Sequence, residues 1–154
     1  MIGTVTVPLT PKSASTAPEA AAPRKVLLID LDPQANASIC LAGDHFLRTI
    51  IEEGHTIDAF IEDRFIKRQM DTELERRIRT NISNVTHLGR QLPVSLLASS
   101  SELRLIERDL IFTLTKTGMA LDRIVEALYA IIKEELKRAR KSYDYILFDC
   151  APGI

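Results

Sequence analysis

The chain has 154 residues, a hydrophobic share of 45% and a charged share of 27%, which fit one globular domain with its own core. Its net charge of −1 provides no overall field that would attract nucleic acid or an anionic membrane. No apolar run approaches the ~20 residues of a membrane span, and the first residues lack the pattern of a signal peptide. We therefore expect a cytoplasmic protein, without a membrane partner, whose distant Cys40 and Cys150 stay reduced.

Residues 1–24 differ in composition from the rest of the chain. From Pro8 to Pro23 the chain is mostly Pro, Ala, Ser and Thr, which bury too little apolar area to offset the entropy cost of ordering. We predict a disordered tail over 1–24 and a single domain over 25–154. Within the tail, residues 2–7 alternate β-prone side chains and favour at most a short strand.

The apolar run that begins at Lys25 predicts a buried strand of a parallel sheet, which ends at Asp30, Leu31 and Asp32 before Pro33. A short helix is expected after the loop at 33–37. We expect Asp44 to cap a second helix that stops at Gly54. Its predicted inner face consists of Phe46, Leu47, Ile50 and Ile51.

Thr56 is the predicted cap of a further helix, and the mixed charges over 64–79 favour a solvated helix. Residues 92–97 are predicted to form a second strand. Ser99 with Glu102 fits a capping box for the helix that follows. Apolar residues at helical spacing predict a long helix from Ala120 to about residue 141. Residues 145–149 form the last predicted strand. Alternating strands and helices indicate a parallel sheet with right-handed crossovers.

Two predicted strands end on aspartates, Asp30 with Asp32 and, at the far end of the chain, Asp149. Open α/β sheets bind ligands at the carboxyl ends of their strands. Hydrated magnesium prefers oxygen ligands and needs only one or two carboxylates, so these residues are candidates for a magnesium-nucleotide site. The alternative is structural, since an aspartate at a strand end also caps the following turn or helix.

The segments VLLIDLDPQANAS at 26–38 and YDYILFDCAPGI at 143–154 resemble two signature segments of the ParA family of partition ATPases, relatives of MinD in the deviant Walker-type P-loop class. The family's first motif usually reads Asp-x-Asp-Pro-Gln-Gly-Asn, and here Ala35 replaces the glycine. The second usually reads Asp-Cys-Pro-Pro, where this chain has Ala151 before Pro152. The stretches at 56–61 and 92–100 are similar to the family's intervening helix and strand, so the resemblance covers 25–154.

The resemblance implies ATP and magnesium as cofactors. It implies that Asp32 is needed for hydrolysis, that Asp149 binds magnesium through water, and that Asp30 belongs to the cofactor-binding residues. It further implies a ParB-like partner, non-specific DNA and a homo- or hetero-dimer. The implied fold class is α/β, a partial P-loop NTPase-like domain with a parallel sheet in a Rossmann-like three-layer arrangement.

The family's glycine-rich Lys-Gly-Gly-x-Gly-Lys-Thr loop has no counterpart in the sequence. The family's second half has no counterpart either. The loop's amides and lysines hold the phosphates, whereas the six glycines here stand singly, at 3, 43, 54, 89, 118 and 153. Without that loop, repulsion between unit charges at ~4 Å amounts to about 4 kcal/mol at intermediate dielectric. We expect the isolated chain not to hydrolyse ATP. We also expect an unfilled slot between or beside the strands at 26–29 and 146–148.

The leading hypothesis is a fragment of a ParA-type partition ATPase. The alternatives are a non-enzymatic module that binds a full-length homologue or partner protein, and a remnant that folds poorly. His45, His55 and His87 share no metal-ligand spacing, and Cys150 is interpreted as a small buried residue. The arginines and lysines over 64–79 are interleaved with acids, which favours a solvated face over a nucleic-acid contact.

Overall fold

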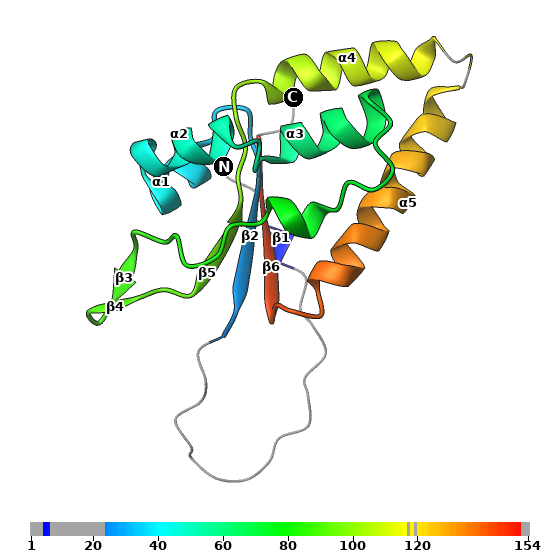
Figure 1. The fold of residues 1–154 in the computed structure, drawn as a ribbon. Helices are drawn as coiled ribbons and strands as arrows, with labels where there is room; N and C mark the ends of the chain where they lie inside the picture. The colour runs from blue at the N-terminus through cyan, green and yellow to red at the C-terminus, as the bar shows by residue number, and fades with distance from the viewer. Residues whose placement is uncertain (1–4, 7–23, 117, 119, 152–154) are drawn as a thin grey trace, which may run out of the picture.

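The protein is an α/β domain built on one mainly parallel sheet (Figure 1). The computed structural model describes residues 5–6, 24–116, 118 and 120–151, so most of the predicted tail lies outside the described residues. The sheet has the order β1-β6-β2-β5. Strands β2 (Val26–Leu31), β5 (Val94–Leu97) and β6 (Tyr145–Cys150) are parallel, and β1 (Val5–Thr6) pairs antiparallel with β6.

Strands β2 and β6 are direct neighbours in this sheet. They pair in parallel over six residues, from Val26 opposite Tyr145 to Leu31 opposite Cys150. The expectation of an unfilled slot between these two strands is therefore wrong. Strand β1 lies on the other edge of β6, where its two residues pair with Leu147 and Phe148.

Alternating side chains of the strands supply two separate cores, one on each face of the sheet. Leu27 and Ile29 of β2 pack into one cluster, while Leu28 packs against the other. On the first face lie α3 (Ile57–Ile61), α4 (Leu103–Thr115) and α5 (Leu121–Ala139). On the second lie α1 (Asn36–Ala42) and α2 (Asp44–Glu52), as Figure 1 shows. The predicted three-layer α/β architecture is confirmed.

The charge-dense stretch at 64–79 is not the solvated helix that its composition predicts. It contains a π-helical turn, η1 (Glu62–Ile66), and a 3-10 turn, η2 (Leu74–Arg77). Phe65 and Leu74 are buried in the first core, because the chain folds back over α3 and α5 here. The buried carboxylate of Glu135 accepts the Leu74 amide at 3.1 Å, which fixes η2 on α5.

Helix starts follow the sequence prediction at Thr56 and depart from it elsewhere. Thr56 Oγ1 accepts the Ala59 amide at 3.2 Å, as expected of a cap. Asp44 lies inside the first turn of α2, and Gly43 precedes it as N-cap. The capping box predicted at Ser99 and Glu102 is wrong: Ser99 is fully buried behind the helix start, and Ser100 Oγ accepts the Glu102 amide instead.

Two of the four residues predicted for the inner face of α2 are buried. Leu47 and Ile50 are buried, but Phe46 and Ile51 are 42% and 39% exposed. A short surface helix buries only a narrow stripe, and the outer two side chains fall at its margins. Beyond α3, a two-stranded hairpin of β3 (Thr86–His87) and β4 (Arg90–Gln91) projects from the domain (Figure 1).

Gly43, between α1 and α2, is expected to tolerate no side chain. Its φ is +78°, and an added Cβ would lie 2.8 Å from Asn84 Nδ2, which donates to the Ala42 carbonyl at 2.6 Å. Gly43→Ala should lower the free energy of unfolding by roughly 1–3 kcal/mol in urea denaturation. Gly89→Ala is the control, since φ there is +74° and no described atom lies within 4 Å of the added Cβ. An equal loss in both variants would contradict the clash.

Candidate functional site

The carboxyl edge of the sheet brings together the three aspartates that the sequence singled out. Asp30 and Asp149 occupy paired positions of β2 and β6, and Asp32 follows directly after β2. Side chains at paired positions of neighbouring strands project from the same face, so the Asp30 and Asp149 carboxylates lie next to one another. The site is therefore an acidic edge formed by residues 119 positions apart in the chain.

Asp30 is fully buried and organises this edge from within. Its Oδ1 accepts the Asp32 amide at 3.0 Å, and its Oδ2 accepts both the amide of Ser38 at 2.9 Å and the hydroxyl of Ser38 at 2.7 Å. Ser38 Oγ in turn accepts the Ser99 amide at 3.1 Å. The network joins the ends of β2, α1 and the segment after β5. With both oxygens occupied, Asp30 is suited to positioning its neighbours.

Asp32 holds the turn that follows β2 with one of its two carboxylate oxygens. Its Oδ1 accepts the Gln34 amide at 2.9 Å, and its backbone carbonyl accepts the Ala35 amide at 2.8 Å. Asp32 Oδ2 has no hydrogen-bond partner among the described residues. Ala35 adopts the left-handed conformation, with φ 53° and ψ 30°. That conformation explains why a glycine suits this position in the motif that the segment resembles.

Asp149 is partly exposed, and its pKa is shifted by the other acids of the site. Burial raises the pKa of Asp149 above its ordinary 3.8, and the carboxylates of Asp30 and Asp32 raise it further. In the described part of the chain, no lysine or arginine forms an ion pair with any of the three aspartates. The edge is therefore an uncompensated concentration of negative charge, which favours a cationic ligand.

A family model described as an AAA domain matches residues 12–154 of the chain. The chain belongs to this AAA domain family. The family is a P-loop NTPase family that includes ParA- and MinD-like proteins, so the chain is a P-loop ATPase-like domain. Neither the curated proteins nor the solved structures contain a significant match.

Magnesium is the cation that AAA domain proteins of this kind generally bind together with nucleotide. Asp149 and the free Oδ2 of Asp32 would hold it, because their oxygens remain available and hydrated magnesium needs few protein ligands. Within the described residues, no group of three or more His, Cys, Asp or Glu is arranged as an all-protein metal site. Asp149 and Asp32 therefore fit a cation that keeps most of its waters.

A second buried polar cluster, which no sequence pattern predicted, lies beside the acidic edge. Asp58 Oδ2 accepts the hydroxyls of Thr56 at 2.9 Å and Ser100 at 3.0 Å. Asp58 Oδ1 and Ser99 Oγ are buried without a hydrogen-bond partner in the described structure. The signal was present in the run Ser99–Ser101 after an apolar strand, but the capping-box pattern offered a simpler local interpretation.

The other candidate residues lie away from this edge or differ from expectation. Cys150 is exposed and not buried as predicted, because it ends β6 near the margin of the sheet. His45 and His87 are exposed. Burial and the neighbouring Arg79 lower the pKa of His55, whose Nδ1 lies 3.1 Å from the Arg76 carbonyl. Of the helices that the structure describes, none is long and apolar enough to cross a membrane.

Removing the Ser38 hydroxyl should destabilise the acidic edge. Ser38→Ala leaves the buried Asp30 with one donor fewer and the Ser99 amide without its acceptor. We expect the free energy of unfolding to fall by about 1–3 kcal/mol in urea denaturation. Ser101→Ala, at an exposed serine of the same run, is the control and should change it by less than about 0.5 kcal/mol. Equal effects would contradict the network.

The raised pKa of Asp149 means that its ionisation should lower the free energy of unfolding, so its contribution to stability is more favourable at low pH than at neutral pH. Since the folded state raises the pKa of Asp149, it binds the proton more tightly than the unfolded chain does, and ionisation of this group costs stability as the pH rises through the folded pKa. Asp149→Asn should therefore stabilise the metal-free protein at pH 7, and the gain should vanish below pH 3.8. Urea denaturation in EDTA across this range measures the effect. Asp71→Asn, at an exposed aspartate, serves as control, and a gain independent of pH would contradict the assignment.

Proposed function

We propose that this AAA domain binds a magnesium-nucleotide at its acidic edge and is part of a ParA-type partition ATPase. The observation that carries the proposal is the register of β2 with β6, which sets Asp149 beside Asp30 and next to Asp32 at the carboxyl ends of two parallel strands. Ligand sites of open α/β sheets lie at this edge. The two motifs at 26–38 and 143–154 meet here, although most of the chain separates them.

In this proposal the three aspartates have different roles. Asp149 would hold hydrated magnesium, which its partly exposed carboxylate can reach and which would offset the negative charge of Asp30 and Asp32 beside it. Asp32 would use its Oδ2, the oxygen that is also available to the hydrated magnesium, to orient the attacking water, because its Oδ1 is committed to the turn. Asp30 positions Asp32 by accepting its amide. When bound, magnesium supplies charge neutralisation between these acids and the phosphates.

The same geometry explains why turnover by this chain alone should be very low. Phosphate groups bound at the acidic edge would lie near three carboxylates, and the isolated glycines of the chain provide no run of amides to hold them. Lys25, the lysine nearest to β2 in sequence, lies at the opposite end of that strand. We therefore propose weak, magnesium-dependent nucleotide binding without efficient hydrolysis.

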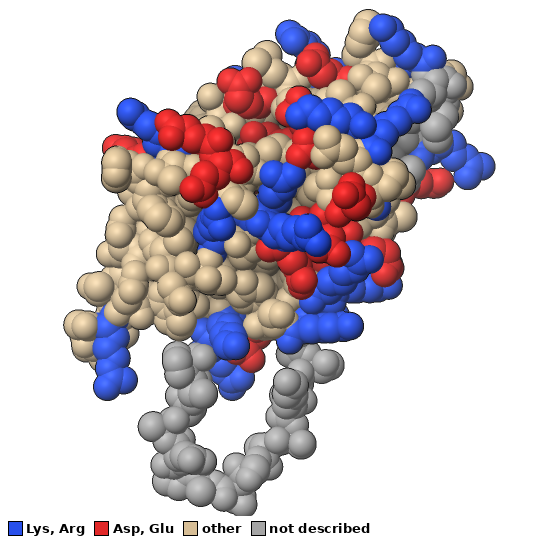
Figure 2. All heavy atoms as spheres, in the orientation of Figure 1, with Lys and Arg blue, Asp and Glu red and all other residues tan. Residues whose placement is uncertain are grey.

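The wider role proposed for the chain follows from the partition ATPases it resembles. It includes ATP-dependent segregation of plasmid or chromosomal DNA in the cytoplasm, with a ParB-like protein, non-specific DNA and a homo- or hetero-dimeric state. Positive and negative side chains are interleaved on the face seen in Figure 2, so that face favours no broad contact with DNA.

Magnesium should stabilise the wild-type chain through Asp149. At a magnesium concentration ten times its Kd, the free energy of unfolding should rise by about 1.4 kcal/mol, and ATP added with magnesium should raise it further. Asp149→Asn should abolish both increases, and Asp71→Asn should preserve them. Thermal unfolding and isothermal titration calorimetry measure these effects, with phosphate release expected at background. Equal stabilisation of wild type and Asp149→Asn would contradict the proposed site.

A further inference from the structure

Helix α5 presents a long outer face that no other part of the described structure covers. The second half of the helix is anchored to the domain, because Glu135 and Ala139 are buried and Glu135 accepts the Leu74 amide. Every described side chain between 121 and 130 is exposed, and Figure 1 shows these turns at the margin of the domain, away from the sheet. The outer face of α5 is therefore accessible to another molecule.

The outer face contains a single stripe of exposed side chains with a tyrosine near its middle. The members of the stripe are three or four positions apart and so lie on one side of the helix: Asp122, Glu126, Tyr129, Lys133 and Lys137. Tyr129 is 64% exposed, and Lys133 Nζ lies 5.5 Å from the centre of its ring. Exposed aromatic side chains of this kind often dominate the binding energy of protein interfaces.

The charges of the stripe are divided by sign. Asp122 and Glu126 precede Tyr129, and Lys133 and Lys137 follow it. Acids near the start of a helix and bases near its end also complement the helix dipole, but that effect is confined to the first and last turns. Glu126 and Lys133 lie outside those turns of α5. The dipole alone therefore does not account for the order of charges along this face.

This order of charges is self-complementary. When two copies of α5 pack antiparallel about a two-fold axis between Tyr129 and Ala130, Glu126 of each copy faces Lys133 of the other. By the same symmetry Asp122 faces Lys137, and the Tyr129 ring packs against the small Ala130. A parallel pair would instead place like charges opposite one another. The face therefore fits a second, antiparallel copy of the chain, because one surface supplies both signs in matching order.

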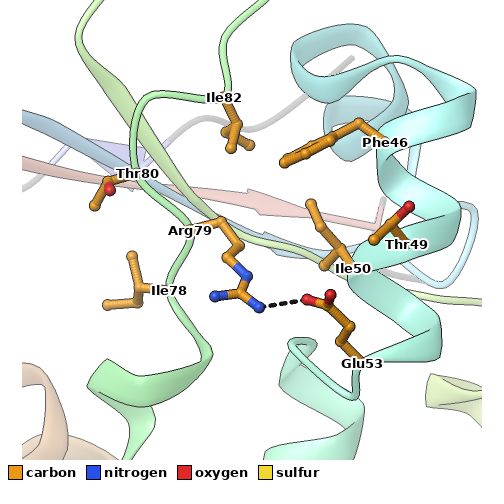
Figure 3. Close-up of a pocket in the computed structure, with 8 residues that line it drawn as sticks. All are labelled: Phe46, Thr49, Ile50, Glu53, Ile78, Arg79, Thr80 and Ile82. Carbon is orange, nitrogen blue, oxygen red and sulfur yellow. Dashed lines mark hydrogen bonds and ion pairs between the residues drawn. The ribbon is translucent and has the colours of Figure 1, made fainter.

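The chain itself supplies no facing segment for these charges, in contrast to α2. Glu53, which directly follows α2, is paired at 2.6 Å with Arg79 of the segment across from it (Figure 3). On α5, Lys133 forms no ion pair with a described residue. Glu126 and Lys137 pair only with exposed side chains one turn away on the same helix. Exposed pairs of this kind contribute little, so these charges remain available to a second copy.

We propose that the outer face of α5 is a homodimer interface, in which two copies pack antiparallel with Glu126 paired to Lys133 of the second copy and Tyr129 at the centre. One pair of helices buries less than the ~1,600 Å² of a standard interface, so the dimer is weak and reversible. The contact needs neither magnesium nor nucleotide. It therefore stands apart from the nucleotide site proposed at the acidic edge.

Sedimentation equilibrium of the 154-residue chain in EDTA, without nucleotide, tests the proposal. Wild type should dimerise with a Kd of about 100 μM. Glu126→Lys and Lys133→Glu each place like charges across the axis and should weaken dimerisation about tenfold. Glu52→Lys makes the same change of charge at an exposed position of α2 and should leave dimerisation unchanged. A wild-type chain that stays monomeric at about 1 mM would overturn the interface.

Exchanging the two charges identifies the second copy as the partner. Combining Glu126→Lys with Lys133→Glu in one chain restores opposite charges across the axis and should restore dimerisation. A mixture of the two single variants should likewise form a heterodimer, although each variant alone is mainly monomeric. Urea denaturation of each variant verifies that the fold is intact.

Three results would overturn the α5 interface. The first is equal dimerisation by wild type and both single variants. The second is a double variant that dimerises no better than the single variants. The third is a dimer that forms only with magnesium and ATP and is lost in Asp149→Asn, which would place the association at the acidic edge. Failure of wild type to bind magnesium or ATP would count against the proposed nucleotide site alone, since the α5 dimer forms in EDTA.

Discussion

The acidic edge depends on one buried carboxylate, that of Asp30. A charge removed from water must be matched by hydrogen bonds, and Asp30 obtains three, from the Asp32 amide and from the amide and hydroxyl of Ser38. These bonds fix where β2 ends and where α1 begins. Through the Ser99 amide they also fix the segment after β5. The turn that presents Asp32 is thereby held by the same residue that places a negative charge beside Asp149.

The hydrogen bonds give the three aspartates of the acidic edge different roles, since Asp30 supports the fold while Asp32 and Asp149 keep oxygens available to a ligand. Asp30 has both oxygens engaged, Asp32 has one, and Asp149 is partly exposed with a raised pKa. Three aspartates at one strand edge therefore offer two groups to a cation, supported by a third. In a P-loop ATPase-like domain, such an edge requires positive charge to accept phosphate. The described residues supply none through ion pairs, which makes magnesium essential to the proposed site.

Much of the fold could be predicted from the sequence, because its signals were local and strong. The apolar run of β2 is typical of a strand covered on both faces, the Thr56 cap satisfies a hydrogen bond three residues away, and the periodic apolar residues of α5 are typical of a helix with one inner face. Prediction was wrong where a residue had a better distant partner than its local one. Ser99 fits a capping box in sequence, but its amide donates to Ser38, 61 residues away. The charged stretch 64–79 folds onto the core because Phe65 and Leu74 are buried there.

The sequence by itself determined the strand-end aspartates, the α/β class and the likeness of two distant motifs to one ATPase family, since each depends on residue type and short spacing. Tertiary structure alone decided that β2 and β6 are neighbours and that Asp30 faces Asp149. It also decided that Arg79 pairs with Leu96. Strand pairing joins residues far apart in the chain, and its register is set by the packing of both sheet faces, which no local pattern records.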